Sequence, residues 1–261
     1  MLIGVNLVTE LVQTTILTGR VLNAKPVSLL LIAAPESGKT SVVLQQPCEA
    51  AAVMNDVTGR GLQVLCQMKA ELSHFILTDL TTVGAHKSNV ARYTISQLTA
   101  ITEEGLKATA VGGQIETYQH GRRGIIACLT QSMAKDKRAW WHRIGLTSRM
   151  LPFSYTYSTP LIIKIKGSID HNKQSKDAGE FIIPKEPISV GFNARETRQV
   201  RHLADEMAGR LKEIGIRRLK QFRALAQAHA LLRHARKVER QDVEFIESIQ
   251  PYISYTEPKA L

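Results

Sequence analysis

The order of hydrophobic and polar positions divides the chain into two parts near residue 193. Before that point, short apolar runs typical of buried strands alternate with segments whose apolar residues recur at helical spacing. After it, apolar residues step by three and four through three successive segments, which predicts three helices. We therefore expect an α/β core with a parallel sheet flanked by helices over residues 1–192, and a helical domain over residues 193–261. The predicted strands are residues 29–32, 50–55, 74–80 and 122–130, and the predicted helices are residues 6–23, 40–46, 62–68, 89–107, 200–214, 216–236 and 242–249.

Two hairpins are predicted within the core. Residues 114–118 alternate, residues 119–121 form a turn signal, and residues 122–130 return as a buried run, so a hairpin with a basic turn leads into a core strand. Residues 151–169 are rich in Phe, Tyr, Thr and Ile, which favours strands. Residues 180–190 carry prolines near both ends, so we expect an edge hairpin over residues 161–190.

A phosphate-binding loop is predicted directly after the first strand. The loop reads G-x-x-x-x-G-K-[ST] with Ala33 in place of the first glycine, and it separates a strand from the start of a helix. In that context Gly38 lets backbone N–H groups close around a phosphate, Lys39 neutralises phosphate oxygens, and the Thr40 hydroxyl can bind Mg²⁺. We therefore predict that the chain binds ATP with Mg²⁺. The predicted nucleotide-binding residues are Pro35, Glu36, Ser37, Gly38, Lys39, Thr40 and Ser41.

A second acidic motif lies at the end of a later strand. The apolar run 74–80 contains Asp79 near its end. An aspartate at the carboxyl tip of a strand beside a phosphate-binding loop can hold the Mg²⁺ shell, directly or through water. We predict that Asp79 and Thr40 share the metal, which is a Walker B role for Asp79.

Composition and charge narrow the class of protein further. Apolar content of 44% and charged content of 22% are ordinary for a globular chain, and the sequence shows no leader pattern and no membrane-length apolar run. We expect a cytoplasmic protein without a membrane partner, in which Cys48, Cys66 and Cys128 are reduced thiols near the core. The net charge is +11, and residues 195–240 hold thirteen Lys and Arg against five Asp and Glu. This excess indicates a polyanionic partner, nucleic acid first and an acidic protein surface second, although a solvated helix face would carry similar charge.

Taken in order, these motifs resemble the AAA+ ATPases, which join an α/β P-loop core to a C-terminal helical lid. The resemblance covers nearly the whole chain and is greatest to the clade with a hairpin ahead of the sensor strand, which includes minichromosome-maintenance helicases and MoxR-type ATPases. The hairpin 114–130 ends at Thr130 or Gln131, where the clade keeps a polar sensor-1 residue. Residues 145–150 are similar to the stretch that supplies an arginine finger, which would be Arg149, and residues 217–230 are similar to the lid segment whose first arginine serves as sensor 2. That residue would be Arg217, with Arg218 as the alternative.

The resemblance implies a homo-oligomer, a ring or a filament with a hexamer as the expected form, in which Arg149 reaches the nucleotide of an adjoining subunit. It also implies that the basic hairpin turn with His120, Arg122 and Arg123 contacts DNA in a central channel. One position departs from the pattern, because Leu80 stands where the family usually has a glutamate that polarises water. Either an acid from elsewhere reaches the water, or hydrolysis is slow and ATP acts mainly as an assembly switch.

Three functions therefore stay open at this point. The first is an oligomeric ATPase that acts on DNA as a helicase, translocase, loader or replication accessory, of a minimal type that would suit a phage or mobile element. The second is a MoxR-like ATPase that remodels proteins. The third is an ATP-gated assembly module with little hydrolysis, for which Leu80 is the reason.

Overall fold

The computed structural model describes residues 4–46, 49–85, 88–111, 114–170 and 182–261, and within these only the backbone of 84–85, 88, 107–111, 114–120 and 169–170. Its centre is a six-stranded sheet in the order β2-β3-β6-β1-β7-β8, in which each neighbouring pair runs parallel. This confirms the predicted α/β class with a parallel sheet. The strands are β1 (Ser28–Ile32), β2 (Ala51–Met54), β3 (His74–Leu77), β6 (Gly124–Leu129), β7 (Met150–Thr156) and β8 (Lys259–Ala260).

Strand order decides which loops meet. β6 lies between β1 and β3, with Ile32 of β1 opposite Leu129 and Leu77 of β3 opposite Ala127. The carboxyl ends of these three parallel strands therefore share one edge of the sheet, which is where α/β folds bind ligands. The amino ends of β1 and β7 meet at the opposite edge, where Ser28 pairs with Met150.

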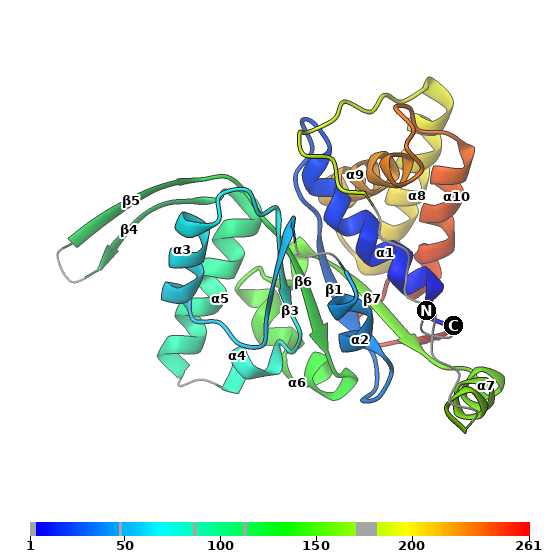
Figure 1. The fold of residues 1–261 in the computed structure, drawn as a ribbon, viewed down its shortest axis with the longest axis horizontal. Coiled ribbons are helices and arrows are strands. Elements are labelled where there is room, and N and C mark those ends of the chain that lie inside the picture. The colour runs from blue at the N-terminus through cyan, green and yellow to red at the C-terminus, as the bar shows by residue number, and fades with distance from the viewer. Residues whose placement is uncertain (1–3, 47–48, 86–87, 112–113, 171–181) are drawn as a thin grey trace.

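Helices cover both faces of the sheet (Figure 1). β1 is buried on both sides, because Leu29 and Leu31 join one hydrophobic cluster while Leu30 and Ile32 join the other. The first cluster includes the apolar residues of α1 (Asn6–Leu17) and α2 (Lys39–Leu44). The second includes those of α3 (Gly59–Met68), α5 (Ser88–Glu103) and α6 (Gln131–Arg143). Short helices α4 (Thr81–Ala85), η1 (Thr18–Arg20), η2 (Thr147–Arg149) and η3 (Gln250–Tyr252) complete the connections.

The C-terminal residues form the helical lid that the sequence predicts, with α8 (Ala194–Leu211), α9 (Ile216–Leu232) and α10 (Arg240–Ile249). Lys212 and Gly215 both adopt positive φ between α8 and α9, which lets the chain reverse. The lid packs beside α1 (Figure 1), and a buried polar cluster joins the two. In that cluster His229 of α9 contacts Asp242 of α10 at 2.7 Å and Glu10 of α1 at 3.0 Å.

The predicted hairpin 114–130 is wrong in its pairing. β5 (Gln114–His120) pairs antiparallel with β4 (Leu106–Val111), which precedes it, and the two form a separate sheet. β6 instead joins the central sheet between β1 and β3. The hairpin therefore spans residues 106–120, and residues 121–123 link it to the core at its base, so they are not its tip.

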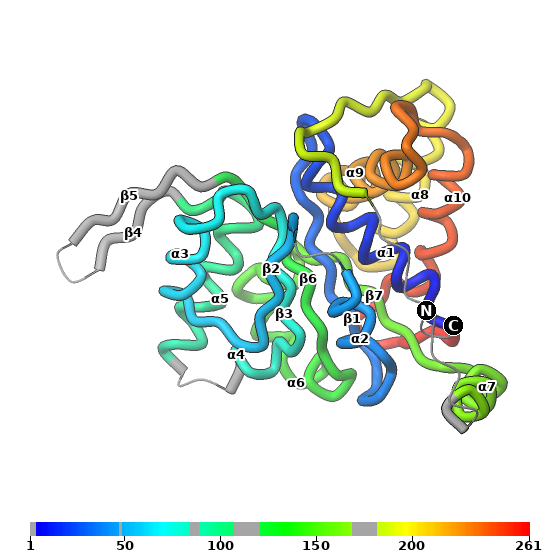
Figure 2. Tube along the Cα trace, in the orientation of Figure 1, coloured from blue at the N-terminus to red at the C-terminus, as the bar shows by residue number. Residues whose placement is uncertain are grey.

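The predicted edge hairpin 161–190 is also wrong over its first strand. Residues 159–170 form a helix, α7 (Thr159–Asp170), which lies apart from the other helices in Figures 1 and 2. Pro160 occupies the second position of this helix, where the missing N–H costs nothing. Residues 182–190 form no strand and contain one isolated bridge, from Ile188 to Val21, while residues 171–181 lie outside the described part of the chain.

Two further expectations can be compared with the structure. Cys66 and Cys128 are buried free thiols, and burial raises the pKa of Cys66 to about 11 and that of Cys128 to about 12, so both stay protonated at neutral pH. Cys48 lies outside the described residues. Across the residues that the structure describes, each helix is too short or too polar to cross a lipid bilayer.

Candidate nucleotide site

The predicted phosphate-binding loop connects β1 to α2 at the carboxyl edge of the sheet. Glu36 and Gly38 adopt positive φ of 61° and 76°, and this left-handed geometry curls the loop back on itself. Pro35, Glu36, Thr40 and Ser41 are exposed, whereas Ser37 is buried. The exposed residues and the first turn of α2 thus face the side from which a ligand would enter.

Lys39 is folded into its own loop. Its ammonium donates to the carbonyl oxygens of Ala33 at 2.9 Å and Ala34 at 2.7 Å, and to the Ser37 hydroxyl at 3.1 Å. Burial lowers the pKa of Lys39, and the negative charge of Asp79 opposes that shift. A phosphate at the loop would offer this buried cation a charged acceptor in place of neutral carbonyls, which is the electrostatic fit that ATP requires.

Two tyrosines contact the loop: Tyr155 lies in β7, and Tyr157 is the residue directly after this strand. The hydroxyls of Tyr155 and Tyr157 both donate to the carbonyl oxygen of Ser37, at 3.0 and 2.6 Å. A side chain at Gly38 would meet the Tyr157 hydroxyl at 3.0 Å, so a glycine suits the position on two counts, its positive φ and this close approach. The sequence analysis missed both tyrosines, because their contact with the loop depends on β7 pairing beside β1.

Asp79 and Thr130 lie at the same edge as the loop. Asp79 is exposed two residues beyond β3, and one of its carboxylate oxygens accepts from the Thr81 N–H at 2.8 Å. Thr130 follows β6 and caps α6, where its hydroxyl accepts from the Met133 N–H at 3.4 Å. Strand order thus brings the predicted Walker B and sensor-1 positions beside the loop. Leu80 is 1% exposed and packs in the core, so no proton acceptor stands at that place.

Thr40 and Asp79 fit a magnesium ion only in combination with phosphate. Among the described residues, no group of three or more His, Cys, Asp and Glu side chains could hold a metal by itself. Mg²⁺ keeps several waters and takes few protein ligands when it accompanies a nucleotide, so one hydroxyl and one carboxylate are a suitable set. When bound, the ion would neutralise negative charge on the phosphate oxygens.

Arg149 lies at the opposite edge of the sheet. It ends η2, directly before the first residue of β7, and Met150 pairs with Ser28 at the amino end of β1. Its Nε is 3.7 Å from a carboxylate oxygen of Glu103 at the end of α5. The five residues of β1 separate this edge from the phosphate-binding loop, a span of roughly 16 Å. The arginine of one chain therefore cannot reach the loop of the same chain.

Arg217 of the lid lies beside Arg149. Its guanidinium donates to the carbonyl and hydroxyl oxygens of Ser148, at 3.1 and 3.3 Å, and lies 3.5 Å from Glu103. Gln221, one turn along α9, donates to the Arg149 carbonyl at 3.0 Å. The lid thus places the predicted sensor-2 arginine with the predicted finger, at the edge remote from the loop of its own chain.

The alternative sensor-2 residue, Arg218, is buried and bonded to side chains within the protein. It is 1% exposed and donates to both carboxylate oxygens of Glu213, at 3.0 and 2.9 Å, and to Gln221 at 2.9 Å. An arginine with a bidentate carboxylate partner inside the lid is a structural ion pair. Of the two neighbouring arginines, Arg217 is therefore the one that faces outward.

The basic residues predicted to contact DNA differ in how exposed they are. Arg123 is 7% exposed and donates to the Ala70 carbonyl at 2.6 Å and the Gly121 carbonyl at 3.0 Å, so it is a buried structural residue at the base of the hairpin. Arg122 is exposed and its Nε donates to the Glu103 carbonyl. The side chain of His120 lies outside the described part of the structure. Because Arg123 is buried and bonded to backbone carbonyls, it presents little surface to a nucleic acid, and its predicted contact with DNA stays a prediction.

Comparison with known proteins supports the fold. The structure is similar to that of a full-length MCM homologue from Methanopyrus kandleri, with a TM-score of 0.52 over 97% of this chain. The chain has the AAA+ fold. It spans 56% of the length of the M. kandleri protein and is 12% identical to it in sequence, so the likeness concerns architecture. The predicted AAA+ core and helical lid are thereby confirmed. No family model matches the sequence, and no curated protein matches it.

Proposed function

We propose that this AAA+ chain binds Mg-ATP and hydrolyses it in a homo-oligomer, at sites shared between two subunits. The observation that supports this proposal is that the residues of the site form two groups, which lie at opposite edges of one sheet. The loop, Thr40 and Asp79 lie at the carboxyl edge, and Arg149 lies with Arg217 at the amino edge. Two such faces on one chain are complementary head to tail, which generates a ring or a filament. A hexameric ring is the form to test first.

Each residue has a defined task in this proposal. Lys39 leaves the carbonyls of its loop to hold phosphate oxygens, and Gly38 lets the backbone close around them. Thr40 and Asp79 orient the metal that accompanies the nucleotide. Arg149 and Arg217 of the adjoining subunit place positive charge on the terminal phosphate as it gathers negative charge in the transition state.

Mixing of variant subunits tests the shared site. We expect Arg149→Ala to lower ATP turnover by about 10³-fold or more, because it removes the charge that stabilises the transferring phosphoryl group. Lys39→Ala should abolish nucleotide binding at its own loop. Mixed oligomers should regain activity, since some interfaces then pair an intact loop with an intact arginine. Arg143→Ala, which removes an exposed arginine at the end of α6, is the matched control and should keep turnover near wild type.

Two results would contradict this proposal. Unchanged ATP turnover in Arg149→Ala would show that this arginine takes no part in the reaction. Mixtures that stay as inactive as either variant would show that both residues act within one chain.

DNA is the proposed polymer on which the ATPase acts, as a helicase, translocase or loader. The support is the charge of the lid, where many of the Lys and Arg side chains are solvent-exposed, namely Arg195, Arg198, Arg201, Arg210, Lys212, Lys220, Arg236, Lys237 and Arg240. Binding through phosphate contacts releases counterions, so affinity for DNA should fall steeply between about 50 and 200 mM salt. Affinity that is flat over this range would contradict the proposal, and ATP turnover that does not respond to DNA would favour a protein substrate.

An ATP-gated assembly module is the second candidate, and Leu80 is the observation that favours it. A leucine that is 1% exposed in the core cannot polarise water. The three acids nearest in sequence lie away from the loop, because Glu71 precedes β3, while Glu103 ends α5 at the amino edge and Glu104 follows it. This candidate would be supported if the wild-type protein assembled only with ATP and hydrolysed it no faster than the Lys39→Ala variant does.

A further inference from the structure

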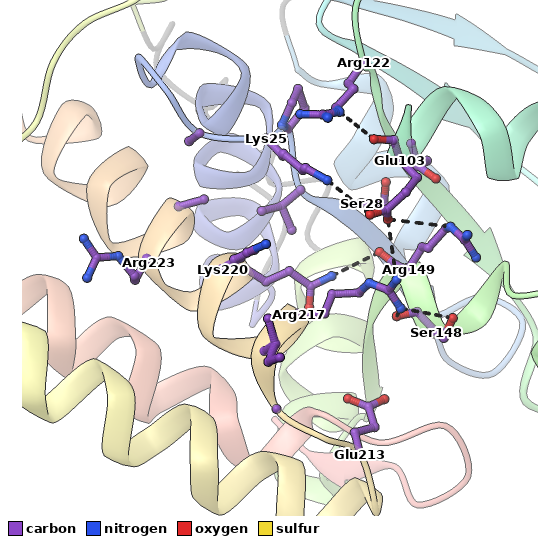
Figure 3. Close-up of a pocket in the computed structure, with 18 of the residues that line it drawn as sticks. Lys25, Ser28, Glu103, Arg122, Ser148, Arg149, Glu213, Arg217, Lys220 and Arg223 are labelled. Atoms are coloured by element: carbon purple, nitrogen blue, oxygen red, sulfur yellow. Dashed lines mark hydrogen bonds and ion pairs between the residues drawn. The ribbon is translucent and has the colours of Figure 1, made fainter. Parts of the chain in front are cut away.

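Glu103 is the common partner of three cations that come from separate segments. Its carboxylate lies 3.1 Å from Lys25 in the loop before β1, 3.7 Å from Arg149 at the end of η2, and 3.5 Å from Arg217 at the start of α9. Both arginines approach the same oxygen, Oε2. One carboxylate thus ties the core to the lid at the point where the two arginines meet, as Figure 3 shows.

The cluster forms part of a pocket of about 890 Å³ at the amino edge. Its lining is strongly cationic, since seven Lys and Arg side chains face only two acids, Glu103 and Glu213. The Arg149 Nε is buried and has no hydrogen-bond partner within the described residues, because the Glu103 oxygen at 3.7 Å is beyond hydrogen-bond distance. The cluster therefore keeps a net positive charge, which would attract a further anion. The cationic lining residues are Lys25, Arg122, Arg149, Lys212, Arg217, Lys220 and Arg223.

We infer that Glu103 is a positioning residue, which holds Arg149 and Arg217 side by side so that they meet the terminal phosphate of an adjoining subunit together. This inference rests on the proposed shared ATPase site. Two guanidinium groups repel each other, and a carboxylate between them offsets that repulsion while no nucleotide is present. A phosphate from the neighbour then supplies the second anion that the cluster lacks.

The surroundings of Glu103 suit a counter-ion rather than a general base. Burial would raise the pKa of this carboxyl, but the hydrogen bond from Lys25 and the charges of Lys25, Arg217 and Arg149 outweigh it, so the pKa is lowered. A carboxylate with a lowered pKa and three cationic partners has little tendency to take a proton from water. Its effect on the reaction therefore passes through the arginines.

Glu103→Gln tests the inference, because it keeps the shape of the side chain and removes its charge. We expect kcat for ATP to fall about tenfold or more, since a misplacement of about 1 Å can cost that much. The KM for ATP should change little, because the loop that binds ATP belongs to the other subunit. Glu104→Gln is the matched control: it makes the same charge change at the next residue, which is exposed and absent from the pocket lining, and it should leave both constants unchanged. Glu103→Asp keeps the charge and should recover part of the lost turnover.

Mixed oligomers and a double variant separate positioning from simple loss of folding. Glu103→Gln subunits mixed with Lys39→Ala subunits should regain turnover, whereas a mixture with Arg149→Ala should not, because both defects then lie on the same face. In the Arg149→Ala background, Glu103→Gln should cost less turnover than it costs in wild type, because only Arg217 is then left to position. Glu103→Gln turnover equal to that of Glu104→Gln, or equal loss in Glu103→Asp and Glu103→Gln, would overturn the inference.

The proposed function and this inference fail in different ways. If Arg149→Ala is as active as wild type, or wild type shows no turnover, the shared ATPase site fails and the inference falls with it. If Arg149→Ala is inactive while Glu103→Gln is not impaired, only the role of Glu103 is refuted.

Discussion

Replacement of Asp242 by asparagine should destabilise the protein by breaking a buried ion cluster that joins the lid to the core. Asp242 is fully buried, and its carboxylate accepts from the Nδ1–H of His229 at 2.7 Å and from the backbone N–H of Glu239 at 2.8 Å. Arg233 donates to it twice, at 2.9 and 2.8 Å. His229 also reaches Glu10 of α1 at 3.0 Å, so this carboxylate holds the histidine that joins lid and core.

The expected loss follows from what asparagine cannot replace. Its carboxamide presents an NH₂ group where the carboxylate accepted, so at least one donor of Arg233 or His229 would lose its acceptor. Breaking a buried ion pair by removing one partner costs about 3–5 kcal/mol. Because the Arg233 side chain is 23% exposed and can regain water, we expect the lower end, about 3 kcal/mol. That is a large share of the 5–15 kcal/mol, roughly, that keeps a domain folded.

Urea denaturation at neutral pH, followed by circular dichroism, measures this loss as a lower midpoint at similar slope. Glu244→Gln is the control, since it removes a carboxylate from an exposed pair with Arg240 and should cost under about 0.5 kcal/mol. If Asp242→Asn stays within about 1 kcal/mol of wild type, the cluster does not hold the lid as we argue.

Three more predictions follow from buried groups. Although burial lowers the pKa of His229, its two carboxylate partners raise it above 6.5, so its stabilisation is complete below about pH 6.5 and is lost as pH rises through the raised pKa. The difference in unfolding free energy between wild type and His229→Gln should therefore shrink as pH rises above about 6.5, and a constant difference would be incompatible with this account. Gly124→Ala should lower the unfolding free energy by about 1–3 kcal/mol, because the new methyl would lie 2.3 Å from the buried ring of His74, and a melting temperature equal to wild type would disprove the clash. Arg123→Ala should cost about 1–3 kcal/mol in the same assay by leaving buried carbonyls without a donor, yet leave affinity for DNA unchanged; weaker DNA binding by a folded variant would restore the residue to the nucleic-acid contacts.

The amino-acid sequence alone determined the features that depend on local pattern. The predicted phosphate-binding loop rests on one strand, one glycine-bearing loop and one helix start, all within residues 28–44. The three lid helices follow from apolar spacing that each segment carries by itself. Asp79 was found in the same way, since an apolar run that ends in an acid can be seen without knowing its neighbours. Each of these signals lies within about twenty consecutive residues, so no long-range contact was needed to read it.

Tertiary structure decided everything that depends on which segments meet. Alternation in residues 114–120 indicates a strand but does not choose its partner. The chain pairs it with β4, because both edges of β6 are already paired, with β1 and with β3. Isoleucine-rich residues 161–165 favour a strand only where a sheet can receive them, and without a neighbouring strand they form α7. The arginines 149 and 217 are 68 positions apart, and only the docking of α9 on η2 brings them to one carboxylate. Charge and burial at such a meeting point are properties of the packed chain, because side chains distant in sequence create them together.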